Sequence, residues 1–137
     1  RKQPEVKGDV YFSAKQLLSN PLGVFDRIVA DYYRRPALLP LIKGLDGKAP
    51  AKVTDLKAEG GTLSWASSPG ARAYAIYRVD GKGDECATAS ARNLVAVVPA
   101  AAGARQSYPI RSGGTYYVTA LDRLTHESAA ARITVAG

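Results

Sequence analysis

From about residue 50 onward, the chain is a series of short segments rich in β-forming residues. They are separated by "EGG", "SSPG", "DGKGDE", "AAGA" and "RSGG", in which glycine, proline, serine and aspartate permit tight turns. Short strands at this spacing are typical of a compact β-sandwich. We therefore expect a mainly β fold with strands at 53–56, 62–66, 73–79, 94–98, 115–121 and 131–136. Alternation along these strands places Trp65, Ile76, Val118 and Ala120 inside.

The first third of the chain follows a different pattern. Residues 9–13, "DVYFS", have the composition of a short strand, and a helix is expected at about 21–34. Asn20 suits the N-cap, and Pro21 suits the first helical position because its missing donor is not needed there. Large apolar residues recur at three- and four-residue spacing and predict one apolar stripe, formed by Leu22, Phe25, Ile28, Val29, Tyr32 and Tyr33.

Residues 36–45, here called the strap, follow this helix. Pro36 and Pro40 exclude both a helix interior and a central strand. The strap is nevertheless rich in large aliphatic side chains, at Leu38, Leu39, Leu41, Ile42 and Leu45. Leaving all of them in water would forgo about 2 kcal/mol each. We therefore expect the helix and the strap to pack against the sandwich, with "GKAP" at 47–50 as the linker between the two parts.

Four segments in the second part match one family pattern in the right order. They are Pro50, Val53 and Leu56; Leu63 and Trp65; Tyr74, Ile76, Tyr77 and Arg78; and "YYVTALDRLTHES". Residues 50–137 thus resemble a fibronectin type III domain, which implies an immunoglobulin-like β-sandwich. One departure is Gly114, which stands where that family has a tyrosine. The tyrosine corner is therefore either missing or rebuilt from Tyr116.

The stretch "GDVYFSAKQLLSNPLGVFDRIVADYYRRPALLPL" is similar to the end of the barrel in the glycosyl-hydrolase-like 10 family of bacterial cell-envelope proteins. This resemblance implies that residues 1–46 are the C-terminal remnant of a (β/α)₈ barrel with its strap, and that 47–137 are a fibronectin type III-like sandwich. It further implies export to the periplasm or cell surface, and catalytic acids upstream of residue 1. The partner would be the missing catalytic barrel of the same polypeptide. Residues expected to pack between the domains are Tyr32, Tyr33, Leu38, Leu39, Leu41 and Ile42.

Charge and composition argue against several other classes of function. The net charge of +7 is divided evenly, with nine basic and five acidic residues in 1–49 and ten and seven in 50–137. A nucleic-acid-binding module usually concentrates its basic residues on one face, so no nucleic-acid partner is expected. Cys86 is the single cysteine, which excludes an intrachain disulfide and a multi-cysteine metal site. No membrane span and no cofactor are predicted.

The sequence supplies no convincing catalytic set. Glycoside hydrolysis needs two carboxyls flanking the bond. Glu5 and Asp9 precede the one barrel-like strand, and Asp26 and Asp31 read as solvated charges on the helix. His126 reads as a surface turn residue.

Three functions therefore stay open. The first is a non-catalytic accessory module of a cell-envelope glycoside hydrolase. The second is a carbohydrate-binding module, for which Tyr77, Tyr108 and Tyr117 could stack on the sugars of a polysaccharide. On a sandwich, however, such tyrosines more often form cross-strand packing pairs. The third is a protein-interaction domain of the adhesion type.

Overall fold

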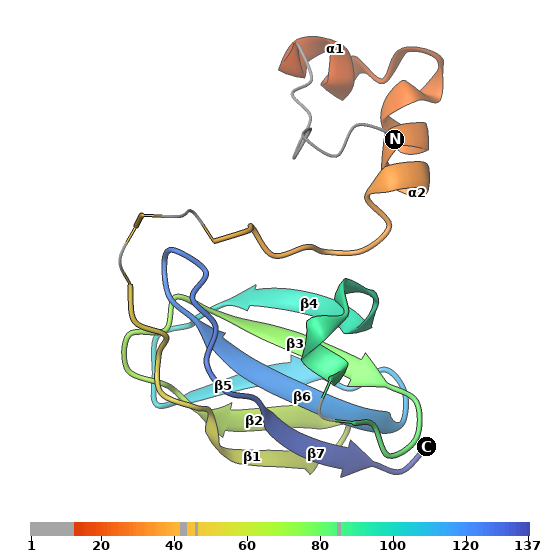
Figure 1. Ribbon diagram of the computed structural model, residues 1–137. Coiled ribbons are helices and arrows are strands. Elements are labelled where there is room, and N and C mark those ends of the chain that lie inside the picture. Colours follow the sequence, from red (N-terminus) through yellow and green to blue (C-terminus); the bar gives the residue numbers. More distant parts are fainter. Residues whose placement is uncertain (1–12, 42–43, 46, 85) are drawn as a thin grey trace. The chain divides into compact units, whose positions relative to one another are not determined.

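The computed structural model describes residues 13–41, 44–45, 47–84 and 86–137 (Figure 1). The chain divides into two compact units, Arg1–Arg34 and Arg35–Gly137. This division assigns the strap to the same unit as the sandwich, whereas linker composition suggested a boundary at 46/47. The strand expected at 9–13 lies outside the described residues except for Ser13, which precedes a helix.

The helical unit contains α1 (Ala14–Ser19), the 3-10 turn η1 (Pro21–Gly23) and α2 (Val24–Tyr32). The helix expected at 21–34 is therefore shorter than predicted and begins with a 3-10 turn. Asn20 has a left-handed backbone, yet its side chain does cap α2. Its Oδ1 accepts a hydrogen bond from the Phe25 amide at 2.8 Å, and its Nδ2 donates to Asp26 Oδ2 at 2.8 Å. The capping residue was identified correctly, but it acts from three residues before the N-cap, Gly23.

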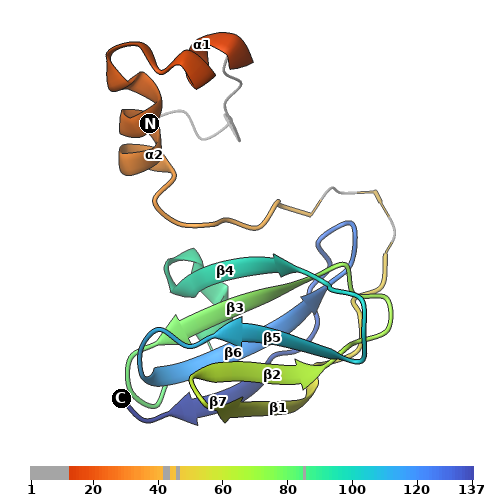
Figure 2. The ribbon, with the colours of Figure 1, turned by 180° about the vertical axis from the view of Figure 1, so that it is seen from behind.

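The second unit is a sandwich of two antiparallel sheets (Figures 1 and 2). Its strands are β1 (Thr54–Glu59), β2 (Thr62–Ala66), β3 (Ala73–Val79), β4 (Leu94–Pro99), β5 (Arg105–Pro109), β6 (Gly114–Leu121) and β7 (Ala131–Val135). One sheet has the order β1-β2-β5, and the other has the order β4-β3-β6-β7. The expected fold class, a fibronectin type III-like β-sandwich, is confirmed.

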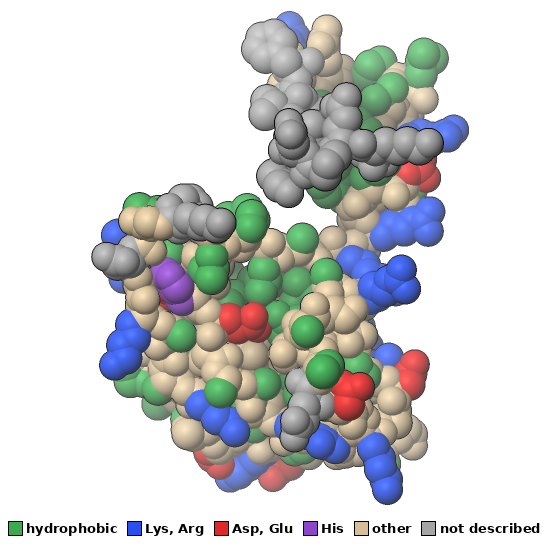
Figure 3. All heavy atoms as spheres, in the orientation of Figure 1, with side chains coloured by type: hydrophobic (Ala, Val, Ile, Leu, Met, Phe, Trp, Pro, Cys, Tyr) green, Lys and Arg blue, Asp and Glu red, His purple; other side chains and the backbone are tan. Residues whose placement is uncertain are grey.

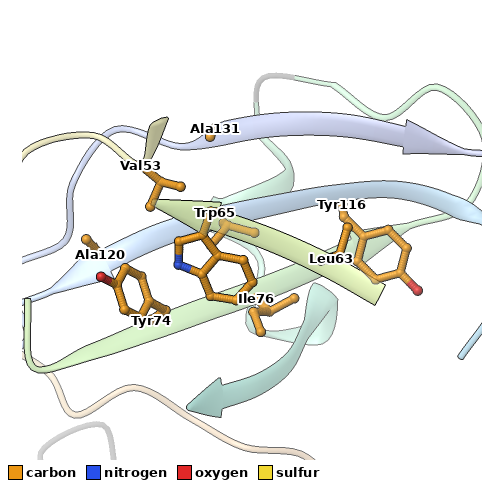
Figure 4. Close-up of a cluster of buried hydrophobic side chains, with 9 residues drawn as sticks. Val53, Leu63, Trp65, Tyr74, Ile76, Tyr116, Ala120 and Ala131 are labelled. Atoms are coloured by element: carbon orange, nitrogen blue, oxygen red, sulfur yellow. The ribbon is translucent and has the colours of Figure 1, made fainter. Parts of the chain in front are cut away.

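The core between the sheets contains all four residues that the alternation placed inside. Trp65, Ile76, Val118 and Ala120 are each fully buried, and Figure 4 shows the surrounding cluster. The Trp65 indole meets the Tyr74 ring edge-on, with centroids 5.3 Å apart. This is the geometry that aromatic quadrupoles favour. These contacts hold the two sheets together around β2 and β3.

The tyrosine corner is not missing but is rebuilt from Tyr116, which was one of the two alternatives that the sequence left open. The Tyr116 hydroxyl donates to the Ser112 carbonyl at 2.7 Å. Gly114 could not carry the tyrosine itself, because its φ is +131° and a Cβ there would lie 2.6 Å from the Val79 carbonyl oxygen. Strand β6 therefore begins with a glycine that allows close strand approach, and the tyrosine moves two residues onward.

Candidate docking surface

The outer face of the four-stranded sheet carries a second hydrophobic cluster. Tyr77 on β3 and Tyr117 on β6 point away from the inner core because their neighbours Ile76 and Val118 point into it. The connection from β3 to β4, with its 3-10 turns η2 (Ala87–Ala89) and η3 (Ala91–Asn93), also contributes to this face. The buried members of the cluster are Ala75, Tyr77, Ala87, Leu94, Tyr117 and Leu121.

The strap contributes one of its leucines to this cluster. Leu38 is half-buried against it. Two polar contacts hold the chain before and after Leu38. The Arg35 guanidinium donates to the Arg92 carbonyl, and Thr125 Oγ1 donates to the Leu39 carbonyl at 2.9 Å. Residues 35–39 are therefore bound to the outer face of the sheet and to the turn after β6.

The other described leucines of the strap remain exposed. The exposed fractions are 76% for Leu39, 57% for Leu41 and 46% for Leu45. The expectation that the sandwich covers the whole strap is thus met at Leu38 and not at these three residues. Ile42, the other predicted packing residue of the strap, lies outside the described residues. We call Leu39, Leu41 and Leu45, together with Pro40 and Leu124, the docking surface.

His126 stands beside this surface (Figure 3, purple) and forms a tight turn with Asp122. Its Nδ1 lies 2.8 Å from Asp122 Oδ2, while Asp122 Oδ1 accepts the amides of Leu124 and His126, both at 2.8 Å. Burial raises the pKa of Asp122, but the hydrogen bonds from His126 and Leu124 outweigh it and hold that pKa below its ordinary value. The description of His126 as a surface turn residue is therefore incomplete, because its side chain is only 19% exposed.

The chain after the strap passes directly over the imidazole. A Cβ at Gly47 would overlap the ring atoms of His126. Next to this contact is a shallow hollow of about 90 Å³, lined by Leu39, Pro40, Leu45, Arg123, Leu124, Thr125 and His126. The hollow has room for a single apolar side chain from elsewhere.

One carboxylate lies on the outer face of the sheet. Glu127 Oε1 accepts hydrogen bonds from the Tyr77 hydroxyl at 2.7 Å and from Thr119 Oγ1 at 2.6 Å. Burial, and then the hydrogen bond and negative charge of Glu127, raise the pKa of Tyr77 far above its ordinary value. Tyr77 is thereby fixed as a neutral hydrogen-bond donor within the cluster.

Two of the three tyrosines considered for sugar stacking are unsuited to that role. Tyr77 is 2% exposed and Tyr117 is 5% exposed. The Tyr117 hydroxyl donates to the Asp84 carbonyl at 2.8 Å, and the Arg132 guanidinium lies 6.0 Å from its ring centroid. These two rings are packing residues, as the more frequent interpretation of such tyrosines predicts. Tyr108 on β5 is only half-buried.

The helical unit has its own exposed apolar side chains. Tyr32 and Tyr33, the predicted packing residues of this unit, are 72% and 52% exposed. Asp31 lies 3.8 Å from Arg27 and 3.9 Å from Arg34, as expected for a solvated charge on the helix. Asp26 is bound by Asn20 instead. Glu5 and Asp9 lie outside the described residues.

Other kinds of site were sought in the described part of the chain. No group of three or more His, Cys, Asp or Glu side chains there is placed to hold a metal ion. In the same residues, no helix is long and apolar enough to cross a membrane. Cys86 is exposed and its thiol is free.

In a comparison with curated proteins, this chain is similar to glycosyl hydrolase YngK of Bacillus subtilis (strain 168). The two are 36% identical over 143 residues. The match includes 94% of this chain but only 27% of the relative, so the chain spans about a quarter of that protein. No family model matches the chain. A solved structure of FN3tt mut is 17% identical, with a TM-score of 0.41, over 62% of this chain and 92% of that one.

Proposed function

We propose that residues 35–137 form a non-catalytic accessory module of a glycoside hydrolase. The observation that supports this most is the extent of the match to the Bacillus protein. Nearly the whole of this chain aligns with only 27% of a protein named as a glycosyl hydrolase. The fold alone does not decide this role, so the surface of the sandwich has to support it.

The docking surface is the proposed point of attachment. Leu39, Leu41 and Leu45 are each about half or more exposed, and the strap carrying them is held in place by Leu38 and by two polar contacts. Covering the three leucines would contribute about 3–4 kcal/mol, at about 2 kcal/mol for a fully buried leucine. A fixed apolar surface of this kind suits an interface with another domain better than it suits water.

The proposed occupant is the catalytic barrel of the same polypeptide. The resemblance of the N-terminal stretch to the barrel end of the glycosyl-hydrolase-like 10 family supports this, with Tyr32 and Tyr33 as further packing residues. An exported, cell-envelope location belongs to the same proposal. The sandwich itself would carry no catalytic residue, because the family's acidic residues would lie upstream.

The test uses the complete polypeptide that the gene encodes, with Leu39→Asp and Leu41→Asp combined. If the surface is an interdomain contact, calorimetry of the natural protein will show one coupled transition, and the variant will show two separate transitions. The matched control combines Val95→Asp and Val97→Asp, which introduces the same two charges at 39% and 37% exposed positions on strand β4. Independent unfolding of the two domains in the natural protein would refute the proposal.

A further inference from the structure

Strands β4 and β5 each form an edge of their own sheet (Figure 2). A groove at these edges is lined by side chains from both sheets. It is lined by Arg78, Val95, Tyr108, Arg111, Ser112 and Tyr116. None of these residues belongs to the docking surface. The groove therefore combines two guanidinium groups with one partly exposed tyrosine, Tyr108, because Tyr116 is 2% exposed and belongs to the inner core. Polar groups beside aromatic surface are found at sites for small polar ligands.

The first guanidinium is held rigidly. Arg78 Nε and Nη2 donate to the Gly113 carbonyl at 2.8 Å and 2.6 Å, and Nη2 also donates to Asp80 Oδ1 at 2.7 Å. The Arg78 side chain is 26% exposed, whereas Asp80 is 91% exposed. These bonds leave Nη1 without a partner in the described part of the chain. Arg78 thus presents a fixed positive charge with an unused donor.

The second guanidinium belongs to the loop between β5 and β6. Arg111 is exposed, and among the described residues no hydrogen bond or ion pair engages its side chain. Its loop is anchored before Arg111 by the bond from the Ile110 amide to the Gly61 carbonyl at 2.7 Å. After Arg111 it is anchored by the bond from Tyr116 to Ser112 and by the bonds from Arg78 to Gly113. Two cationic side chains therefore line one groove, and Asp80 is paired with the first of them, Arg78.

The apolar part of the groove is formed by Tyr108 and Val95. Tyr108 is half-buried and packs in part against the inner core, and Val95 is 39% exposed. An aromatic ring beside an arginine suits a sugar, whose C–H face packs on the ring while an acidic substituent meets the guanidinium. Arg111 can bind a carboxylate or phosphate group through paired donors, whereas the described contacts of Arg78 leave its Nη1 for such a group.

We propose that this groove binds an anionic sugar residue of an acidic polysaccharide, with a carboxylate at Arg78 and Arg111 and the sugar ring on Tyr108. The proposal does not depend on the module belonging to a hydrolase. It relocates carbohydrate recognition from Tyr77 and Tyr117, which are buried, to the third tyrosine and the two arginines beside it.

The experiment titrates this chain with tetragalacturonic acid in calorimetry, and follows the backbone amides by NMR. Binding in the millimolar range is expected, with the largest shifts at residues 108–113. Arg111→Ala should weaken binding about tenfold or more, because it removes a charge-assisted contact. Tyr108→Ala should weaken it by a smaller factor. Arg111 is exposed and its side chain makes no hydrogen bond or ion pair with the described residues, so its variant should unfold at about the same temperature as the natural chain.

The matched control is Arg72→Ala. Arg72 is exposed, directly precedes β3 and therefore lies at the opposite end of that strand from Arg78. The Arg72→Ala variant removes the same charge as Arg111→Ala. If both variants lose the same affinity for tetragalacturonate, the binding is a general attraction between a basic surface and a polyanion, and the proposal is overturned. The methyl ester of the same tetrasaccharide should not bind, whereas glucose 1-phosphate tests whether a phosphate replaces the carboxylate.

Three further results would overturn the proposal. They are the absence of binding at about 10 mM tetragalacturonate, unchanged affinity in Arg111→Ala, and tighter binding of a tetra-glutamate peptide than of the sugar. The last result would assign the groove to acidic proteins. Stronger binding of glucose 1-phosphate than of galacturonate would refute the carboxylate assignment.

Discussion

At the scale of single residues, burial determines which aromatic side chains hold the fold and which can meet a ligand. Trp65 is fully buried, and its Nε1 is the one buried side-chain nitrogen or oxygen in the described residues that lacks a hydrogen-bond partner. Its contribution to stability is therefore one of packing. Sequence alternation sufficed to place it inside, because Leu63 and Trp65 occupy the same face of β2.

Trp65→Ala is expected to lower the free energy of unfolding of the sandwich by about 3–5 kcal/mol, because it removes a large side chain and leaves a cavity. Denaturant unfolding followed by circular dichroism measures this change. Trp65→Phe should cost less, since it keeps an aromatic ring beside Tyr74. A loss below about 1 kcal/mol in Trp65→Ala would contradict the core assignment.

Gly47 gives a second test at this scale. Because a Cβ at this position would overlap the His126 ring, Gly47→Ala is expected to destabilise the chain by about 1–3 kcal/mol. The double variant with His126→Ala removes the obstacle. The cost of Gly47→Ala should then largely disappear when it is measured in the His126→Ala background. An equal cost in both backgrounds would show that the ring is not the cause.

At the scale of elements, the alternation of apolar residues predicted most strands correctly. One strand was not predicted, because its interior position is polar. Strands β2 and β3 have the predicted bounds, 62–66 and 73–79. Strand β5 was missed because its most buried residue is Gln106. The Gln106 amide bonds the backbone of Ala101 and the hydroxyl of Ser67, which satisfies a polar group in the interior. The sequence around Gln106 does not predict its bond to Ser67, which lies 39 residues earlier.

The candidate site was partly predictable for a similar reason. The need of the strap for a partner followed from its composition, and Leu38 does contact the sheet. The contact of Gly47 with His126 joins residues far apart in the sequence, and short-range periodicity carries no information about it. The sequence did not assign Tyr77 and Tyr117 to a face of the sheet, and their burial depends on the β3–β4 connection and the strap.

The strap therefore offers a test by comparing its leucines in the isolated chain. Leu38→Ala should lower the free energy of unfolding by about 1–2 kcal/mol, because it removes a half-buried side chain that packs against the outer face of the sheet. Leu41→Ala should change it by less than about 0.5 kcal/mol, since Leu41 is 57% exposed. Chemical denaturation of both variants measures the difference. Equal effects would mean that the strap is not bound to the sheet through Leu38.

The turn after β6 predicts a dependence on pH. The pKa of Asp122 is lower in the folded chain than its ordinary value of 3.8, so the unfolded chain takes up the proton first as the pH falls. The stabilisation of the folded chain by the ionised Asp122 carboxylate is therefore fully present above about pH 5. It is lost as the pH falls through the pKa of Asp122 in the folded chain. The stability difference between the natural chain and Asp122→Asn should shrink between about pH 5 and pH 3 in thermal melts. Asp80→Asn, at a 91% exposed position, is the control.

At the scale of the whole molecule, this chain matches a hydrolase over a quarter of that protein's length, while its most distinctive described surface is apolar. The fold of this chain therefore does not by itself identify a function. The sandwich is established by its sheet order, whereas the chemistry of the proposed parent would reside in a part that this sequence does not include.

The purified chain of 137 residues is accordingly expected to show no glycosidase activity. The expectation rests on the carboxylates available. Glu127 is engaged by Tyr77 and Thr119, and Asp122 by His126 and the turn amides, so both serve the structure of the sandwich. Release of aryl alcohol from a panel of aryl glycosides, and of reducing ends from bacterial wall glycan, measures this. Turnover that survives repeated purification and is abolished by one acidic substitution would place a catalytic site in this chain and remove the basis for an accessory role.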